Sequence, residues 1–208
     1  MKMWIKVNQN QSELITRLFD EAGHLIEQED HECAVKMLQN CLNLGPEPKM
    51  RVSILNELGY CCLRLGWFEE AAISFSEYLK IHPSDNDGRF FLASAYASMK
   101  WTDEAMEELR TILGIDPTDV LARHDLALCF RNKGWLKESF EEMKRANEYA
   151  ALYGNAEEKE IVKSSLGHIE EEIQDGDEDG TKETFFLFIL LATVIKRSKL
   201  KTRKPPRG

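Results

Sequence analysis

The strongest constraint on the fold is a repeat with a period of 34 residues. Trp67, Trp101 and Trp135 follow one another at this spacing, and the same step joins Pro83 to Pro117. Self-similarity at this period is typical of stacked helical hairpins, because a single hairpin cannot bury its apolar face alone and must share a core with its neighbours. The spacing therefore predicts an all-α chain.

Each period reads as two helices separated by a tight turn. In the clearest example, apolar residues recur at helical spacing over 52–65, Gly66 interrupts the pattern, and a second helical run ends at Pro83. The next two periods repeat this plan, and a weaker copy precedes them, followed by three additional residues. The predicted units are 15–48, 52–85, 86–119 and 120–153.

The residues at fixed offsets within these units resemble the tetratricopeptide-repeat (TPR) family. In unit 52–85 the resemblance is carried by Leu55, Leu58, Gly59, Ala71, Phe75 and Pro83. The resemblance implies a right-handed superhelix of about four helical hairpins that holds another polypeptide. Four positions depart from the family pattern: Arg89 and Arg123 replace a large apolar residue, Ser139 replaces an alanine, and Ala151 replaces the last proline.

Further segments flank the predicted array. Residues 1–14 form an N-terminal extension, and residues 154–174 read as a capping helix whose apolar stripe is Ile161, Leu166, Ile169 and Ile173. An acidic, glycine-containing stretch at 175–182 predicts a flexible linker. The last segment, 183–208, is first apolar and then basic.

Charge is distributed unevenly along the chain. The net charge is −9, and residues 181–208 contribute +7, so residues 1–180 carry −16. An acidic body disfavours nucleic-acid binding, which needs a basic surface. The five cysteines include no CxxC pair, and the N-terminus has no apolar run of signal-peptide length. Both features predict a cytoplasmic protein.

The apolar run at 184–195 leaves three alternatives open. As a helix it would be about 18 Å long, whereas a bilayer core needs about 30 Å. The run could pack on the array or on a partner, anchor at a membrane surface through residues 184–204, or form a disordered tail. The tail residues predicted for membrane or partner contact are Phe185, Phe186, Phe188, Leu190, Lys196 and Arg197.

The TPR resemblance also implies where a partner binds. In this family the first helices of the hairpins line a groove that holds an extended or helical peptide. The residues here that match groove-lining offsets are Phe19, Asn56, Tyr60, Leu63, Arg64, Phe90, Ser94, His124, Leu128 and Arg131. Their mixture of apolar and polar side chains suits a peptide held by apolar anchors and a few hydrogen bonds.

Two subclasses of the family can be weighed on particular residues. TPR domains that grip a C-terminal carboxylate use Lys and Asn at positions that Phe19, Gly23 and Glu57 occupy here, so such a clamp is not predicted. The stretch GRFFLASAY at 88–96 is similar to bacterial type III secretion chaperones that hold translocator proteins. A secretion chaperone is therefore one alternative to a general scaffold.

No residue pattern indicates catalysis. The sequence contains no HExxH, no phosphate-binding glycine loop and no recognised nucleophile setting. His24 and His31 are interpreted as solvated surface residues rather than metal ligands. We therefore predict a non-enzymatic scaffold or chaperone without cofactor or metal, or alternatively a membrane-tethered adaptor. The sequence does not indicate an oligomeric state.

Overall fold

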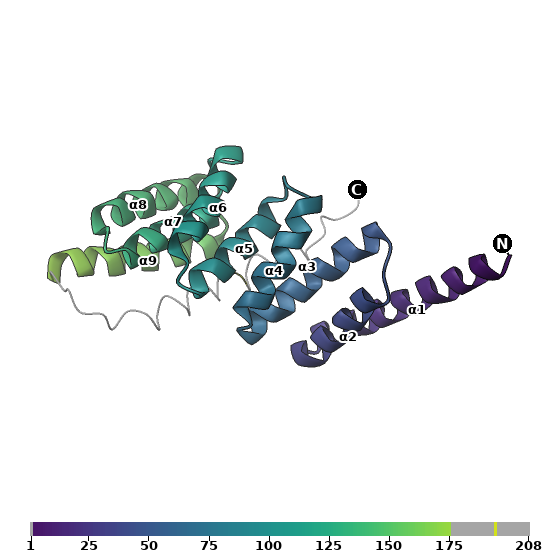
Figure 1. Cartoon of the computed structure of the whole chain (residues 1–208). Helices are drawn as coiled ribbons and strands as arrows, with labels where there is room; N and C mark the ends of the chain where they lie inside the picture. Colours follow the sequence, from purple (N-terminus) through teal and green to yellow (C-terminus); the bar gives the residue numbers. More distant parts are fainter. Residues whose placement is uncertain (1, 176–193, 195–208) are drawn as a thin grey trace. The chain divides into compact units, whose positions relative to one another are not determined.

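The computed structural model describes residues 2–175 and residue 194 of the chain (Figure 1). Among these residues the secondary structure is entirely α-helical, which confirms the all-α prediction. The helices are α1 (Lys2–Glu27), α2 (His31–Asn43), α3 (Pro48–Leu65), α4 (Phe68–Ile81), α5 (Asn86–Ser98), α6 (Thr102–Ile115), α7 (Val120–Asn132), α8 (Leu136–Tyr153) and α9 (Ala156–Asp175).

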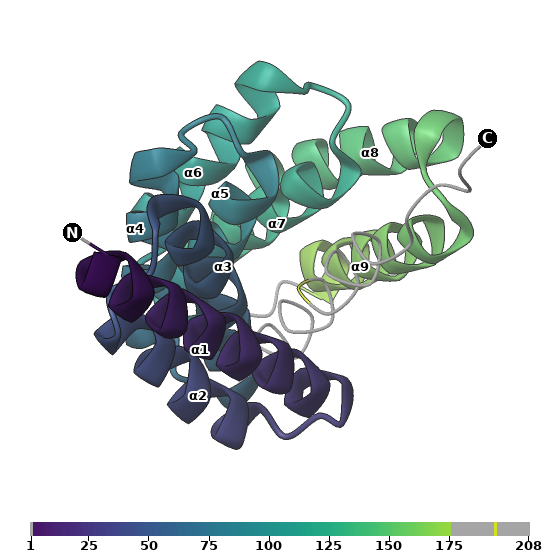
Figure 2. The ribbon, with the colours of Figure 1, turned by 90° about the vertical axis from the view of Figure 1, so that its right-hand side faces the viewer.

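The helices belong to two compact units, Met1–Phe91 and Leu92–Gly208, and α5 crosses the boundary between them. In the first unit α1 packs on α2, α2 on α3, and α3 on α4. Figure 2 shows α1 lying beside α2. Helix α1 is 26 residues long and α2 only 13, so the range 1–14 and the start of the first repeat share one continuous helix. In the second unit α7 packs mainly on α8, and α8 on α9.

One turn geometry recurs at the 34-residue period. Gly66, Lys100 and Gly134 all have left-handed backbone conformations, with φ of 76°, 64° and 74°. The amide that follows each of them belongs to a tryptophan and donates to the carbonyl five residues earlier at 2.9 Å, which closes the preceding helix in a Schellman motif. The tryptophans then precede α4, α6 and α8 with nearly equal dihedral angles. The sequence repeat is therefore also a structural repeat.

Small residues allow the two helices of a hairpin to approach closely, as the sequence predicts. Gly59 of α3 faces the ring of Phe75 of α4, and a Cβ atom added at Gly59 would lie only 2.7 Å from that ring. Phe75 is fully buried, and its ring centroid lies 5.4 Å from that of Phe91. The glycine is thus required by close approach and not by its backbone angles.

Three of the departures from the TPR pattern, Arg89, Arg123 and Ser139, have specific contacts. The Arg89 guanidinium donates to the Pro83 carbonyl at 2.6 Å, and Arg123 donates in the same way to Pro117 at 2.8 Å. Each arginine therefore ties its helix to the turn before it. The buried Ser139 hydroxyl donates to the Ala127 carbonyl at 2.7 Å, so the polar atom that replaces an alanine is satisfied.

The apolar stripe predicted for the capping helix is wrong at Ile173, and the buried face also includes residues that the prediction did not name. Helix α9 buries Val162, Ser165, Ile169 and Glu172, whereas Ile173 is 44 % exposed. Two polar residues take buried positions because α7 supplies polar partners for them, as described below. The residues predicted in the tail, 183–208, lie outside the described part of the chain except Val194, which is 2 % exposed.

Candidate functional site

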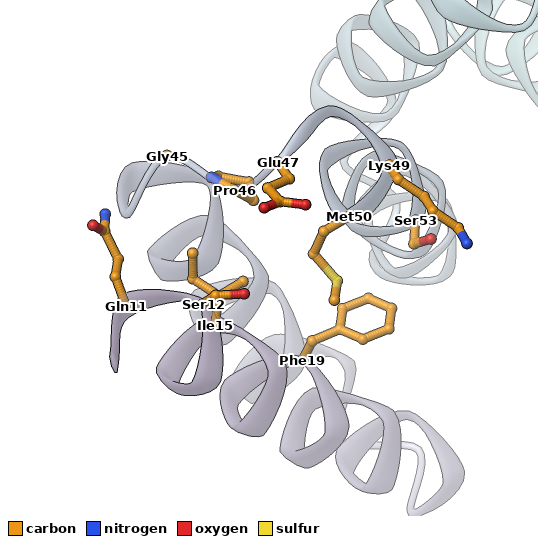
Figure 3. A pocket seen from close by; sticks show the side chains of 10 residues that line it. All are labelled: Gln11, Ser12, Ile15, Phe19, Gly45, Pro46, Glu47, Lys49, Met50 and Ser53. Carbon is orange, nitrogen blue, oxygen red and sulfur yellow. The ribbon is translucent and has the colours of Figure 1, made fainter. Parts of the chain in front are cut away.

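A cavity of about 530 Å³ lies in the first unit, between α1 and the start of α3. Phe19 of α1 and Met50 of α3 point toward one another across it (Figure 3). Its other lining residues are Gln11, Ser12, Ile15, Gly45, Pro46, Glu47, Lys49 and Ser53. An apolar floor with a polar rim is the composition expected of a pocket that takes an apolar side chain and orients the chain that bears it.

The loop between α2 and α3 forms one wall of this cavity. Gly45 has a left-handed φ of 69°, which turns the chain sharply after α2. Pro46 follows, and Pro48 occupies the first turn of α3, where its missing amide hydrogen costs nothing. The Gln11 side chain donates to the Leu44 carbonyl and so ties α1 to this loop. The cavity therefore lies between elements that contact one another directly.

A continuous face of α3 leads away from the cavity. Ser53, Tyr60 and Arg64 lie at helical spacings of seven and four residues, so their side chains share one side of the helix. Asn56 lies beside this line, and its buried Oδ1 atom has no hydrogen-bond partner within the described chain. We call this face, together with the cavity, the α1/α3 groove.

The far end of the α1/α3 groove carries a cation. The Arg64 guanidinium donates to the Tyr60 hydroxyl at 3.0 Å and lies 3.9 Å from the carboxylate of Glu29. The Arg64 side chain is 20 % exposed, whereas Glu29 is 79 % exposed. Hydrogen bonds to a charged donor are shorter than 3.9 Å, so the pair with Glu29 is a loose contact.

His31 packs behind this arginine. Its ring meets the Tyr60 ring edge-on with centroids 6.1 Å apart, and neither ring nitrogen has a hydrogen-bond partner among the described residues. Burial lowers the pKa of His31, and the neighbouring Arg64 charge lowers it further. The prediction that His31 is a solvated surface residue is therefore wrong, whereas His24 is exposed.

The ten groove residues predicted from the sequence fall into an accessible group and a buried group. Phe19, Asn56, Tyr60 and Arg64 have accessible surface and belong to the α1/α3 groove. Leu63, Phe90, Ser94, His124 and Leu128 are each no more than 3 % exposed. Arg131 has a side chain that is 8 % exposed. The sequence could not separate these groups, because a helix of a stacked hairpin presents buried and accessible positions with the same 34-residue period.

Two of the buried predicted residues hold α9 against α7. His124 Nε2 lies 2.9 Å from the Ser165 hydroxyl, and Nδ1 lies 2.8 Å from the Asp125 carboxylate. Arg131 Nε donates to Glu172 at 2.8 Å, and both side chains are nearly buried. A polar network of this kind fixes the register of the capping helix, because each partner would be left unsatisfied by a shift along the axis.

The hydrogen bonds that join Ser165, His124 and Asp125 follow the order of a hydrolase catalytic triad. All three residues are at least 96 % buried. A nucleophile must reach its substrate, and this hydroxyl is enclosed between α7 and α9. We therefore interpret the network as a packing device. Sequence reasoning missed it because His124 and Ser165 are 41 residues apart.

The two adjacent cysteines of α3 are buried. Burial raises the pKa of the Cys61 and Cys62 thiols to about 12, so neither is a thiolate at neutral pH. No cluster of three or more potential metal ligands occurs among the described residues. Within the same residues, no helix is long and apolar enough to cross a membrane.

Comparison with known families agrees with this geometry. Residues 52–85 and 87–119 match the tetratricopeptide repeat family model. The chain therefore contains TPR repeats. The first matched range has the bounds of the unit 52–85, the second begins one residue after the start of the unit 86–119, and the first range includes most of α3. No curated protein sequence matches the chain.

Solved TPR structures share the fold at low sequence identity. MamA (residues 41 to the end) from Desulfovibrio magneticus RS-1 is 16 % identical, with a TM-score of 0.64 over 91 % of this chain and 97 % of MamA. TPR-like repeats assigned to a kinesin light chain of Podosopora anserina are 17 % identical, with a TM-score of 0.61 over 94 % and 99 %. YrrB, a TPR protein with an unusual peptide-binding site, is 15 % identical, with a TM-score of 0.57 over 88 % and 90 %.

Proposed function

We propose that this TPR protein is a scaffold that binds an extended peptide segment of a partner protein in the α1/α3 groove. The observation that carries the proposal is the cavity of about 530 Å³ between Phe19 and Met50. It is open to a partner, has an apolar floor, and continues into a face of α3 with polar groups. An apolar side chain of the peptide fills the cavity, and the peptide backbone runs along Asn56 and Tyr60.

The polar groups of the groove suit a peptide backbone. Asn56 Oδ1 is an acceptor without a partner in the described chain, and a peptide N–H is a donor that could satisfy it. Because a buried acceptor without a hydrogen bond costs free energy, a ligand that supplies the donor gains affinity. The Tyr60 ring offers apolar contact beside it.

The groove can be tested by selection from a phage-displayed library of random peptides on the immobilised chain. The native chain should enrich peptides that share an apolar residue, and Phe19→Asp should abolish the enrichment because it places a charge on the cavity floor. Ile73→Asp is the matched control, since Ile73 is 62 % exposed on α4, away from the cavity. Enrichment by Phe19→Asp equal to that of the native chain would contradict the proposal.

Two narrower functions are separate proposals. A type III secretion chaperone would use the same groove for a translocator segment. A membrane-tethered adaptor would use residues 184–204, which lie outside the described chain except Val194. Fractionation of the full chain tests the tether, since a soluble protein with no membrane-bound fraction would exclude it. We propose no catalytic activity, cofactor or nucleic-acid partner.

A further inference from the structure

The α1/α3 groove has an apolar end and a cationic end, and their separation defines a ligand. The cavity reaches α3 at Ser53, and Arg64 lies eleven residues further along the same face. At 1.5 Å per residue the two points are about 16 Å apart along α3. An extended peptide covers this distance in about five residues.

Arg64 is suited to receive an acidic group. A guanidinium has five N–H donors, and the one hydrogen bond that Arg64 makes within the described chain goes to the Tyr60 hydroxyl. The arginine side chain is four-fifths covered, so its position is determined by packing over the Tyr60 ring, 5.9 Å from the ring centroid. A held guanidinium loses little side-chain entropy when a carboxylate binds it.

Glu29 marks the direction from which a carboxylate approaches. Its Oε1 atom lies 3.9 Å from Arg64 Nη2, too far for a good hydrogen bond. Glu29 sits in the turn between α1 and α2 with a left-handed φ of 63°, and its side chain is 79 % exposed. It therefore occupies the acceptor side of Arg64 loosely, and a ligand carboxylate can take its place.

We infer that the partner segment bears an acidic residue about five positions from its apolar anchor, and that this residue pairs with Arg64 in place of Glu29. The inference rests on the proposed function, because it uses the same groove. The inference specifies the chemical class of the bound segment, which is an extended peptide with one apolar and one acidic side chain at a defined separation. Glu29 then acts as an internal competitor for the arginine.

The peptides selected on the native chain test this inference. Among enriched sequences, Asp or Glu should recur about five residues from the shared apolar residue. A synthetic peptide of one enriched sequence is then labelled, and its affinity is measured by fluorescence polarisation against four chains: native, Arg64→Gln, Glu29→Gln and Lys80→Gln. Lys80 is an exposed cation on α4, so its variant controls for the loss of one positive charge.

The two variants of the pair should act in opposite directions. Arg64→Gln should weaken binding about tenfold, the effect of losing one charge-assisted hydrogen bond. Glu29→Gln should strengthen it about two- to fivefold, since an exposed competing charge contributes little. Lys80→Gln should change it less than twofold. A folding defect cannot imitate this pattern, because it would not strengthen binding in the Glu29 variant.

The outcomes separate the inference from the proposed function. Enriched peptides with an apolar residue but no acidic preference, or an affinity unchanged in Arg64→Gln, would overturn the inference and leave the groove intact. Tighter binding by Arg64→Gln would also overturn it. If the native chain enriches no peptide at all, both the groove and the inference fail together.

Discussion

The contact between Gly59 and Phe75 leads to a quantitative prediction about the hairpin core. Replacing Gly59 by alanine in the interior of α3 gains about 1 kcal/mol of helix propensity. The new Cβ, however, would lie 2.7 Å from the Phe75 ring, which is fully buried and packed on Phe91. Overpacking of this kind typically costs about 1–3 kcal/mol. We expect Gly59→Ala to destabilise the protein by about 1 kcal/mol.

The chain itself suggests a compensating change. At the equivalent positions 34 and 68 residues later, the small residue is Ala93 or Ala127, and the position of Phe75 is held by Leu109 and Met143. The alanine thus occurs with a slimmer partner. Phe75→Leu alone should cost about 1–2 kcal/mol through the volume that it leaves empty. In the double variant the added methyl fills part of that volume, so its stability should return close to that of the native chain.

Thermal unfolding followed by circular dichroism measures these effects. For a chain of this size, 1 kcal/mol shifts the melting temperature by about 2–4 °C. Gly167→Ala is the matched control: it makes the same change inside α9, where an added Cβ meets nothing within 4 Å, and it should stabilise the protein. Equal stability of Gly59→Ala and Gly167→Ala would refute the packing argument. So would a double variant whose loss of stability equals the sum of the losses in Gly59→Ala and Phe75→Leu.

Three further predictions concern other sites. Lys100→Gly should raise stability by about 1 kcal/mol in the same melting assay, because a lysine there adopts a left-handed backbone that glycine accepts without strain; an unchanged melting temperature would contradict this. The pKa of His31 is lowered in the folded state, so the unfolded chain binds the proton first and stability falls as the pH drops through about 6.5. The variant His31→Phe should therefore lose less stability than the native chain between neutral pH and about pH 5. Equal losses in the two chains would refute the lowered pKa of His31. Glu172→Ala leaves Arg131 nearly buried without its carboxylate, at a cost of about 3 kcal/mol; hydrogen exchange should rise in α9 while α3 stays protected, and uniform exchange would contradict a local effect.

The sequence predicted the helical hairpins well because their turns and close contacts repeat. Trp67, Trp101 and Trp135 mark the same turn, and Gly59 marks a close approach that only a small residue permits. Each of these signals is local or periodic, so it can be read without knowing which residues meet across the fold.

The binding site was harder to predict for a physical reason. Leu63 and Arg64 are consecutive residues of α3, yet the Arg64 side chain is accessible and Leu63 is buried. His124 and Arg131 look like exposed polar groove residues, but α9 covers them through Ser165 and Glu172. The covering partner lies about forty residues away, and nothing in the local pattern encodes its presence. The cavity likewise depends on the turn at Gly45, which the repeat pattern does not contain.

The recurring turn before α4, α6 and α8 also provides spectroscopic reporters. Its three tryptophans are 38 %, 51 % and 43 % exposed and begin their helices with matching backbone angles. Their aromatic neighbours differ, because Trp101 stacks on Tyr96 and Trp135 packs on Phe130, and the Lys133 ammonium lies 4.7 Å from the Trp135 ring. Chains in which Trp4 and two of these three tryptophans are replaced would therefore report the melting of each hairpin separately by fluorescence, and would show whether the array unfolds as one cooperative block or from one end.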